Sequence, residues 1–168
     1  MVGVLDQHNT SYQGNAVILA TGHSANDIYE LLYKKNISIE AKPFALGVRV
    51  EHPQHLIDQI QYSCEIRDNY LPPASYSLVN KRDNRGAYSF CMCPGGIIAP
   101  CATSNDEVVT NGWSPSKRNN EYANSGIVVP VYPEDTADFK EFGPLSGLKF
   151  RSSIEHKAWQ LGGKNQGA

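Results

Sequence analysis

The stretch GAYSFCMCPGGIIAPCA, residues 86–102, decides how the chain is expected to fold. It contains two short runs of mainly apolar residues, at 86–93 and 97–102, and Pro94-Gly95-Gly96 lies between them. Short runs of this kind, bounded by Pro and Gly, are typical of strands joined by a tight connection. The stretch therefore predicts strand, loop and strand.

The same pattern extends along the second half of the chain. Further strands are predicted at 76–80, 107–111 and 126–132. Turn signals separate them, at Asp83-Asn84-Arg85-Gly86, Ser104-Asn105-Asp106 and Asn111-Gly112. Closely spaced strands with such turns favour antiparallel pairing. This half is expected to be mostly antiparallel, and a last helix is predicted from about residue 152 to residue 161.

The beginning of the chain predicts two strands and a helix. The strands are expected at 2–5 and 16–21, and the run NAVILATG around the second is typical of a strand buried on both faces. Ser24 followed by Asp27 resembles a capping box, which predicts a helix reaching about Asn36.

The segment FALGVRVE, residues 44–51, predicts a further strand. Arg49 and Glu51 share one face of it, and such a pair is more often a solvated ion pair than a site. Pro53 fits the first turn of a helix that reaches about Tyr62. Together these patterns predict an α+β fold, with a mixed, largely antiparallel sheet and a few helices.

Composition narrows the classes of function. The 168 residues suffice for one domain with a core, and a net charge of −2 gives no general attraction to nucleic acid or anionic membranes. No apolar run approaches the roughly 20 residues that span a bilayer, and no secretory leader is visible. The four cysteines are too few for a disulfide scaffold. We expect a cytoplasmic protein with small-molecule or protein partners, and neither nucleic acid nor membrane.

Cys91, Cys93 and Cys101 allow three interpretations. A zinc or thiol-redox site would use their sulfurs, although the spacing departs from the usual ligand pairs and from C-x-x-C. Buried cysteines that act as small apolar core residues are the simplest explanation. In the third interpretation, Pro94-Gly95-Gly96 lets a ligand approach the main-chain N–H groups, although an ordinary hairpin turn explains the motif equally well.

The segment Ala20-Thr21-Gly22 allows a similar choice. Ligands of open α/β sheets bind beyond the carboxyl ends of strands, where Gly22 permits close approach and the hydroxyls of Thr21 and Ser24 offer hydrogen bonds. A well-capped turn between a strand and a helix is the alternative. The chain contains neither G-x-G-x-x-G nor G-x-x-x-x-G-K-[ST], and no His lies in a nucleophile motif. We therefore assign no catalytic residue.

Four segments together resemble a known family. They are VILATGHSANDIYELL (17–32), AKPFALGVRVEHPQHLID (41–58), YSFCMCPGG (88–96) and VVTNGWSPSKRNNEYANSGIVV (108–129). In this order they resemble bacterial FAD-dependent dehydrogenases, also described as NAD(P)/FAD-dependent oxidoreductases, over nearly the whole chain. The resemblance implies a longer protein whose split FAD-binding domain carries G-x-G-x-x-G. It also implies an inserted domain that covers the flavin and shapes the substrate site.

On this resemblance the chain is expected to be an internal fragment. Residues 1–40 would form the edge of the FAD-binding domain and residues 41–168 the inserted domain. The residues expected to line the FAD site are Thr21, Gly22, His23 and Ser24. A second group, Cys93, Pro94, Gly95 and Gly96, resembles a Cys-Pro-Gly-Gly loop that lies near the isoalloxazine in some related flavin reductases. No metal ligand is assigned.

The resemblance implies that the parent enzyme transfers hydride or electrons through FAD to an unidentified small-molecule substrate, with NAD(P)H as a candidate partner. The redox chemistry would belong to the flavin. The fragment alone is expected to be inactive and to bind FAD weakly or not at all, because it would hold only half of the cofactor site. Two alternatives stay open: a stand-alone ligand-binding module, and a small zinc or thiol-redox domain that uses Cys91, Cys93 and Cys101.

Overall fold

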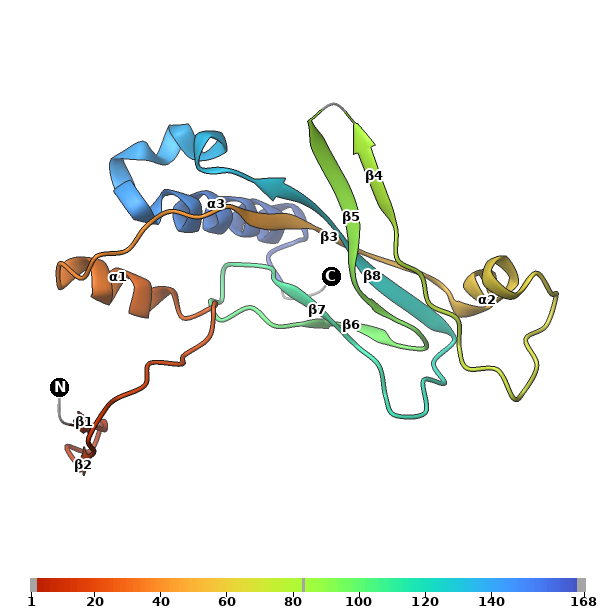
Figure 1. The fold of residues 1–168 in the computed structure, drawn as a ribbon, viewed down its shortest axis with the longest axis horizontal. Helices are drawn as coiled ribbons and strands as arrows, with labels where there is room; N and C mark the ends of the chain where they lie inside the picture. The colour runs from red at the N-terminus through yellow and green to blue at the C-terminus, as the bar shows by residue number, and fades with distance from the viewer. Residues whose placement is uncertain (1–2, 83, 166–168) are drawn as a thin grey trace. The chain divides into compact units, whose positions relative to one another are not determined.

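A computed structural model of the chain describes residues 3–82 and 84–165 (Figure 1). The chain divides into two compact units, residues 1–38 and 39–168, and each unit is described by itself. Within the described residues the structure is α+β, with three α-helices and antiparallel sheets of two, four and two strands. The predicted fold class is confirmed.

The first unit begins with a small β-hairpin. Strand β1 (Gly3–Leu5) pairs antiparallel with β2 (Ser11–Gln13), which lies between the two strands predicted from the sequence. The Asp6 carboxylate closes the turn, because its Oδ1 accepts hydrogen bonds from the backbone N–H groups of His8, at 2.8 Å, and Thr10, at 2.9 Å. These bonds hold the pKa of Asp6 below its ordinary value against a smaller effect of desolvation.

Two predictions for the first unit are wrong. Residues 16–21 form no strand, and Ile18 is 89% exposed. A strand needs neighbours for its N–H and C=O groups, and none of the described strands pairs with this run. Helix α1 (Asn26–Lys34) is confirmed, but its N-cap is Ala25 and no side chain caps it, so the predicted capping box at Ser24 does not form.

The second unit is built on a four-stranded antiparallel sheet with the order β3-β8-β5-β4 (Figure 1). The strands are β3 (Phe44–Pro53), β4 (Val79–Arg82), β5 (Arg85–Cys93) and β8 (Tyr122–Val131). Strands β3 and β8 pair along all ten residues of each. Strand β8 begins four residues before the predicted strand. Its first residues include the polar Asn124 and Ser125, which pair with β3 but do not belong to the apolar run on which the prediction was based.

A separate two-stranded sheet consists of β6 (Ile97–Pro100) and β7 (Thr110–Trp113). Strand β7 begins three residues later than predicted. Strand β6 pairs with β7 and not with β5. The interpretation of Pro94-Gly95-Gly96 as an ordinary hairpin turn is therefore wrong, since these residues connect two different sheets.

Helix α2 (Gln54–Tyr62) confirms the predicted helix, and Pro53 occupies its N-cap position in extended conformation. A 3₁₀ segment, η1 (Pro133–Leu145), was not predicted, and α3 (Ser146–Leu161) begins six residues before the expected start. Gly143 and Pro144 interrupt the apolar pattern at this point, which hides the helix start from a periodicity argument. No helix among the described residues is long and apolar enough to cross a membrane.

The apolar core is small. Its buried apolar side chains are Ile57, Ala74, Ala123, Val131 and Leu145. Many large apolar side chains remain exposed in the second unit, among them Val48 at 66%, Phe90 at 59% and Trp113 at 57%. Contiguous exposed apolar patches mark interaction surfaces more often than single exposed residues do.

Candidate functional site

The loop between β5 and β6 contains Cys93, Pro94, Gly95 and Gly96. Cys93 is half-buried, and the other three residues are buried. Gly95 has a φ of +51°, and a Cβ there would lie 1.9 Å from the carbonyl oxygen of Arg118. A Cβ at Gly96 would meet the backbone of β7. Both glycines are therefore required by packing within the chain itself.

The polar backbone groups of this loop already have partners. The N–H of Gly95 donates to Oε1 of Gln54 at 2.7 Å, and the N–H of Gly96 donates to the carbonyl of Tyr122 at 2.9 Å. The Pro94 carbonyl accepts a hydrogen bond from the Ser114 hydroxyl at 2.9 Å. A ligand that used these two N–H groups would have to displace internal hydrogen bonds.

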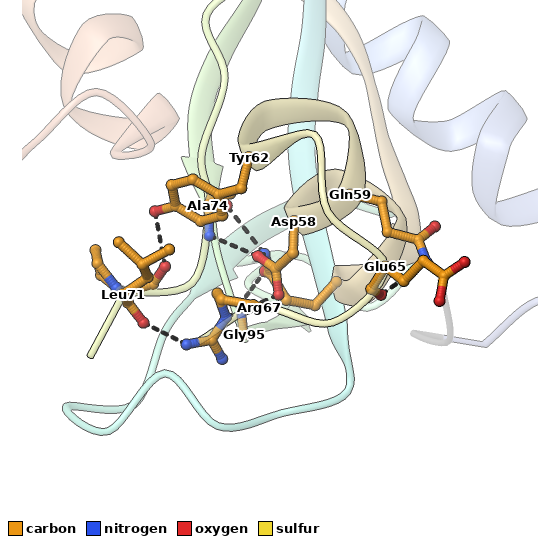
Figure 2. A network of polar contacts seen from close by, with 10 residues as sticks. Asp58, Gln59, Tyr62, Glu65, Arg67, Leu71, Ala74 and Gly95 are labelled. Atoms are coloured by element: carbon orange, nitrogen blue, oxygen red, sulfur yellow. Dashed lines mark hydrogen bonds and ion pairs between the residues drawn. The ribbon is translucent and has the colours of Figure 1, made fainter. Parts of the chain in front are cut away.

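A buried polar network behind the loop fixes its position (Figure 2). The Gln54 side chain, which accepts from Gly95, donates to Oδ1 of Asp58 at 2.9 Å and to the Ala74 carbonyl at 3.0 Å. Oδ1 of Asp58 also accepts from the Ala74 N–H at 2.8 Å, and its Oδ2 accepts from Nε of Arg67 at 2.9 Å. The network thus ties the loop to α2 and to the segment that follows α2.

The segment between α2 and β4 makes further hydrogen bonds, which Figure 2 also shows. The Tyr62 hydroxyl donates to the Pro72 carbonyl at 2.9 Å, and the Arg67 guanidinium donates to the Leu71 carbonyl. Helix α2 itself ends at Ser63, which has a left-handed φ of 53°. The segment is therefore an ordered support of the loop rather than a separate feature.

Asp58 is charged within this network. Its burial works to raise the pKa of the carboxyl group, but hydrogen bonds from Ala74, Gln54 and Arg67, together with the Arg67 charge, outweigh burial. The net result is a pKa below the ordinary value. Three donors, one of them the charged Arg67 guanidinium, thus stabilise a buried carboxylate.

A β-bulge lies immediately before the loop. The pairing of β5 with β8 shifts between Phe90 and Cys93, and Cys91 has a φ of +45°. Residues two apart in a regular strand share a face, but a bulge redirects the side chains. A regular strand would place Cys91 and Cys93 on the same face, and the bulge between them removes the basis for that placement.

Arg49 of β3 holds this bulge. Its Nη1 and Nη2 donate to the Cys91 carbonyl at 3.2 and 2.7 Å, and Nη1 also donates to Oδ1 of Asn124 at 3.0 Å. The guanidinium packs so closely on Gly112 of β7 that a Cβ there would lie 2.1 Å from Nη1. Arg49 therefore joins four strands, and its interpretation as a solvated ion pair with Glu51 is wrong.

Asn124 is fully buried beside Arg49. Its Nδ2 has no hydrogen-bond partner within the part of the chain that the structure describes. A buried donor without an acceptor costs about 1–3 kcal/mol. In the Arg49–Asn124 contact, the side-chain oxygen of Asn124 thus has a hydrogen-bond donor, whereas its side-chain nitrogen has no acceptor among the described residues.

All four cysteines are free thiols. Cys91 and Cys101 are exposed and Cys64 and Cys93 are half-buried, so the interpretation of these cysteines as buried core residues is wrong for the two exposed ones. The Cys93 thiol donates to the Cys91 carbonyl at 3.3 Å. Across residues 3–82 and 84–165, no group of three or more His, Cys, Asp or Glu side chains is arranged to hold a metal ion.

The A-T-G segment belongs to the first unit. Thr21, Gly22 and His23 are exposed, and Ser24 is half-buried. Gly22 has a φ of +82° and would meet nothing within 4 Å if it carried a Cβ. The four residues precede α1 in an irregular segment, so here the turn into the helix forms without the strand that was expected before it.

Sequence reasoning assigned Arg49 to a solvated ion pair and missed three further polar residues around the loop, which are Gln54, Asp58 and Asn124. Gln54 and Asp58 are four apart on α2 and flank the buried Ile57, so their spacing marks a buried polar pair on one helix face. Their connection to Gly95 has no local signal. Cys93 is the one residue of the Cys93–Gly96 loop with a titratable side chain. The loop is therefore better suited to provide a rigid contact surface than acid–base catalysis.

Comparison with known proteins identifies the class of the chain. Residues 43–168 match the family described as FAD-dependent protein, C-terminal domain-like. The match covers three quarters of the chain, and the chain belongs to this family. The resemblance to FAD-dependent proteins, expected from the sequence, is thereby confirmed at the level of the flavoprotein family.

One relative is an uncharacterised protein of Clostridium beijerinckii (strain ATCC 51743 / NCIMB 8052). It is 46% identical over 152 residues, which cover 89% of this chain and 28% of the relative. The chain therefore spans less than a third of the length of this relative.

Proposed function

We propose that the chain is an internal part of an FAD-dependent oxidoreductase, in which residues 41–168 form the inserted domain that covers the flavin and residues 1–40 contribute an edge of the FAD-binding domain. The observation that carries this proposal is the family match over residues 43–168. The relative in which the matched segment makes up 28% of the length supports the idea of a longer parent protein.

In the parent, the Cys93–Gly96 loop would lie on the flavin side, and Thr21, Gly22, His23 and Ser24 would line the FAD site. The buried network of Gln54, Asp58 and Arg67 supports the first role, since a cofactor contact is most useful when the loop that makes it is held in place. FAD, when bound, supplies the hydride or electron transfer, and these residues supply position and shape.

The finer proposal is a dehydrogenase of the cytoplasm that acts on a small molecule and exchanges electrons with NAD(P)H. The half-site in the 168-residue chain should bind FAD weakly or not at all. Neither the ligand-binding module nor the zinc or thiol-redox domain has a specific observation in its favour.

The first experiment is purification of the full-length protein from the gene that encodes this chain. We expect a yellow protein with about one FAD per polypeptide after gel filtration, and bleaching of the flavin when NADH or NADPH is added without oxygen. Absence of FAD from the folded full-length protein contradicts the flavoprotein proposal. Absence of bleaching removes NAD(P)H and leaves the flavoprotein proposal intact.

The 168-residue chain is the matched sample. Titrated with FAD under the same conditions, it should show no stoichiometric complex that survives gel filtration. A stable yellow complex of the chain alone would overturn the idea that it holds only half of the FAD site.

A further inference from the structure

One face of the β3–β8 strand pair carries a row of apolar side chains, which we call the valine face: Val48, Val50, Ile127 and Val129. The register places them together. Val48 pairs with Ile127, Val50 pairs with Ser125, and Val129 pairs with Leu46. Directly paired residues of antiparallel strands point to the same face, and alternate residues along a strand do so as well.

The valine face is exposed along the middle of the β3–β8 pair, in which β3 is the edge strand of the sheet. Val48 is 66% exposed, Val50 38% and Val129 39%, and Ile127 is half-buried. These side chains lie on strands of ten residues that pair along their whole length, so their exposure does not come from a frayed strand end.

The ends of the same β3 face do have partners. The Phe44 ring packs on Gly147 of α3, where a Cβ would lie 3.0 Å from it. The His52 ring lies 5.4 Å from the Tyr76 ring, centre to centre. On the opposite face of β3, Arg49 is covered by Gly112 of β7. Between these two ends, the valine face places four apolar side chains next to one another without such a partner.

Around the valine face, the same side of β3 and β8 carries no acidic side chain, lysine or arginine. The positions on this side are Phe44, Leu46, Val48, Val50 and His52 of β3, and Ala123, Ser125, Ile127, Val129 and Val131 of β8. Burial lowers the pKa of His52, against the nearby Glu51 charge, so its ring is neutral near pH 7. Such a surface fits an apolar protein surface and offers nothing to a phosphate or a nucleic acid.

We propose that the valine face docks on the FAD-binding part of the same, longer polypeptide. This inference rests on the proposed function, in which the chain is one part of that polypeptide. The matched relative supplies the reason, because 72% of its length lies outside the segment that this chain covers. A covalent link keeps two such surfaces at high effective concentration, so a small apolar patch is enough to hold them together.

The test places a lysine on each face of the sheet. Val48→Lys and Val50→Lys change the valine face, and Val79→Lys is the matched control on β4, where Val79 is 71% exposed. The register puts Val79 on the opposite face, through Tyr88 and Val128. Each variant is made in the full-length protein and in the 168-residue chain, and the thermal midpoint Tm is measured for both.

In the full-length protein we expect Val48→Lys and Val50→Lys to lower the Tm by about 5 °C or more, because docking would bury an unpaired charge. Val79→Lys should change the Tm by less than about 2 °C. In the 168-residue chain all three variants should stay within about 2 °C of the parent chain. If the lysine variants of the full-length protein do not fold, Val48→Thr should still give a smaller drop that the chain alone does not show.

Equal effects of Val48→Lys and Val79→Lys in the full-length protein would overturn the inference. So would a dimer of the full-length protein, seen by light scattering, that Val48→Lys converts to a monomer, since the valine face would then bind a second copy. The FAD content of the unmodified protein is measured separately. A protein without FAD refutes the proposed function, whereas the Tm comparison alone decides whether the valine face is covered.

Discussion

The side-chain oxygen Oε1 of Gln54 accepts a hydrogen bond of 2.7 Å from the backbone N–H of Gly95, 41 residues further along the chain. Both residues are buried. The bond connects the first turn of α2 to the turn that links two sheets. It makes the position of the Cys93–Gly96 loop depend on a helix with which the loop shares no local sequence pattern.

Gln54→Leu should destabilise the protein by about 1–3 kcal/mol, because it leaves the buried N–H of Gly95 without an acceptor. Gln61→Leu is the matched control, since Gln61 is an exposed glutamine of the same helix. Urea denaturation followed by circular dichroism measures both. Equal free energies of unfolding for the two variants would show that the Gln54–Gly95 bond contributes nothing.

Asp58 should make stability fall in acid. Its folded pKa is lowered, so its contribution is fully present above the unfolded pKa of about 4 and is lost as the pH drops through the lower folded pKa. Asp58→Asn should therefore lower stability at pH 7 and flatten the decline between pH 5 and pH 2. The measurement is the urea midpoint across that range, and the exposed Asp138→Asn is the control. An unchanged acid decline in Asp58→Asn would contradict the assignment.

Gly95→Ala and Gly22→Ala separate packing from backbone conformation. Both glycines have a positive φ, but only Gly95 has a backbone atom where the new Cβ would lie. Gly22→Ala should cost about 1–2 kcal/mol, the ordinary cost of the left-handed region. Gly95→Ala should cost about 3 kcal/mol or more, because Arg118 must also move. Similar losses of unfolding free energy for the two variants, measured by chemical denaturation, would mean that the backbone at Arg118 shifts easily to make room for the new Cβ.

The thiols should divide into two classes. Cys91 and Cys101 are exposed, whereas Cys64 and Cys93 are half-buried. A thiol-reactive dye added to the native protein should label two thiols quickly and two more slowly, because access limits the reaction. Cys91→Ser and Cys101→Ser should each remove one fast thiol. Fast labelling that persists in the double variant would show that one of the half-buried thiols is accessible.

The parts of the fold that the sequence predicts are those with a local cause. The alternation in FALGVRVE and the position of Pro53 predict β3 and α2, because both patterns depend on neighbours in the chain. The run at 16–21 has the composition of a buried strand and forms none, since a strand requires partners that its own residues cannot supply.

The candidate site shows the same contrast between features with a local cause in the sequence and features that depend on distant residues. Gly95 and Gly96 were singled out because Pro-Gly-Gly is visible in the sequence, but the reason for both glycines is the close approach of residues far along the chain. Arg49 was interpreted through its nearest charged neighbour on the strand. Its actual partners, the Cys91 carbonyl and Asn124, lie on other strands and become neighbours only when the sheet forms.

The central position of β8 in the sheet has a consequence for biosynthesis. This strand pairs with both β3 and β5, yet it follows them in the chain. Until Tyr122–Val131 has left the ribosome, β3 and β5 lack the strand that lies between them, and β3 has no partner in the sheet. Nascent chains that end before residue 122 therefore expose unpaired strand edges, which favour aggregation, and the four-stranded sheet can form only after β8 has been synthesised.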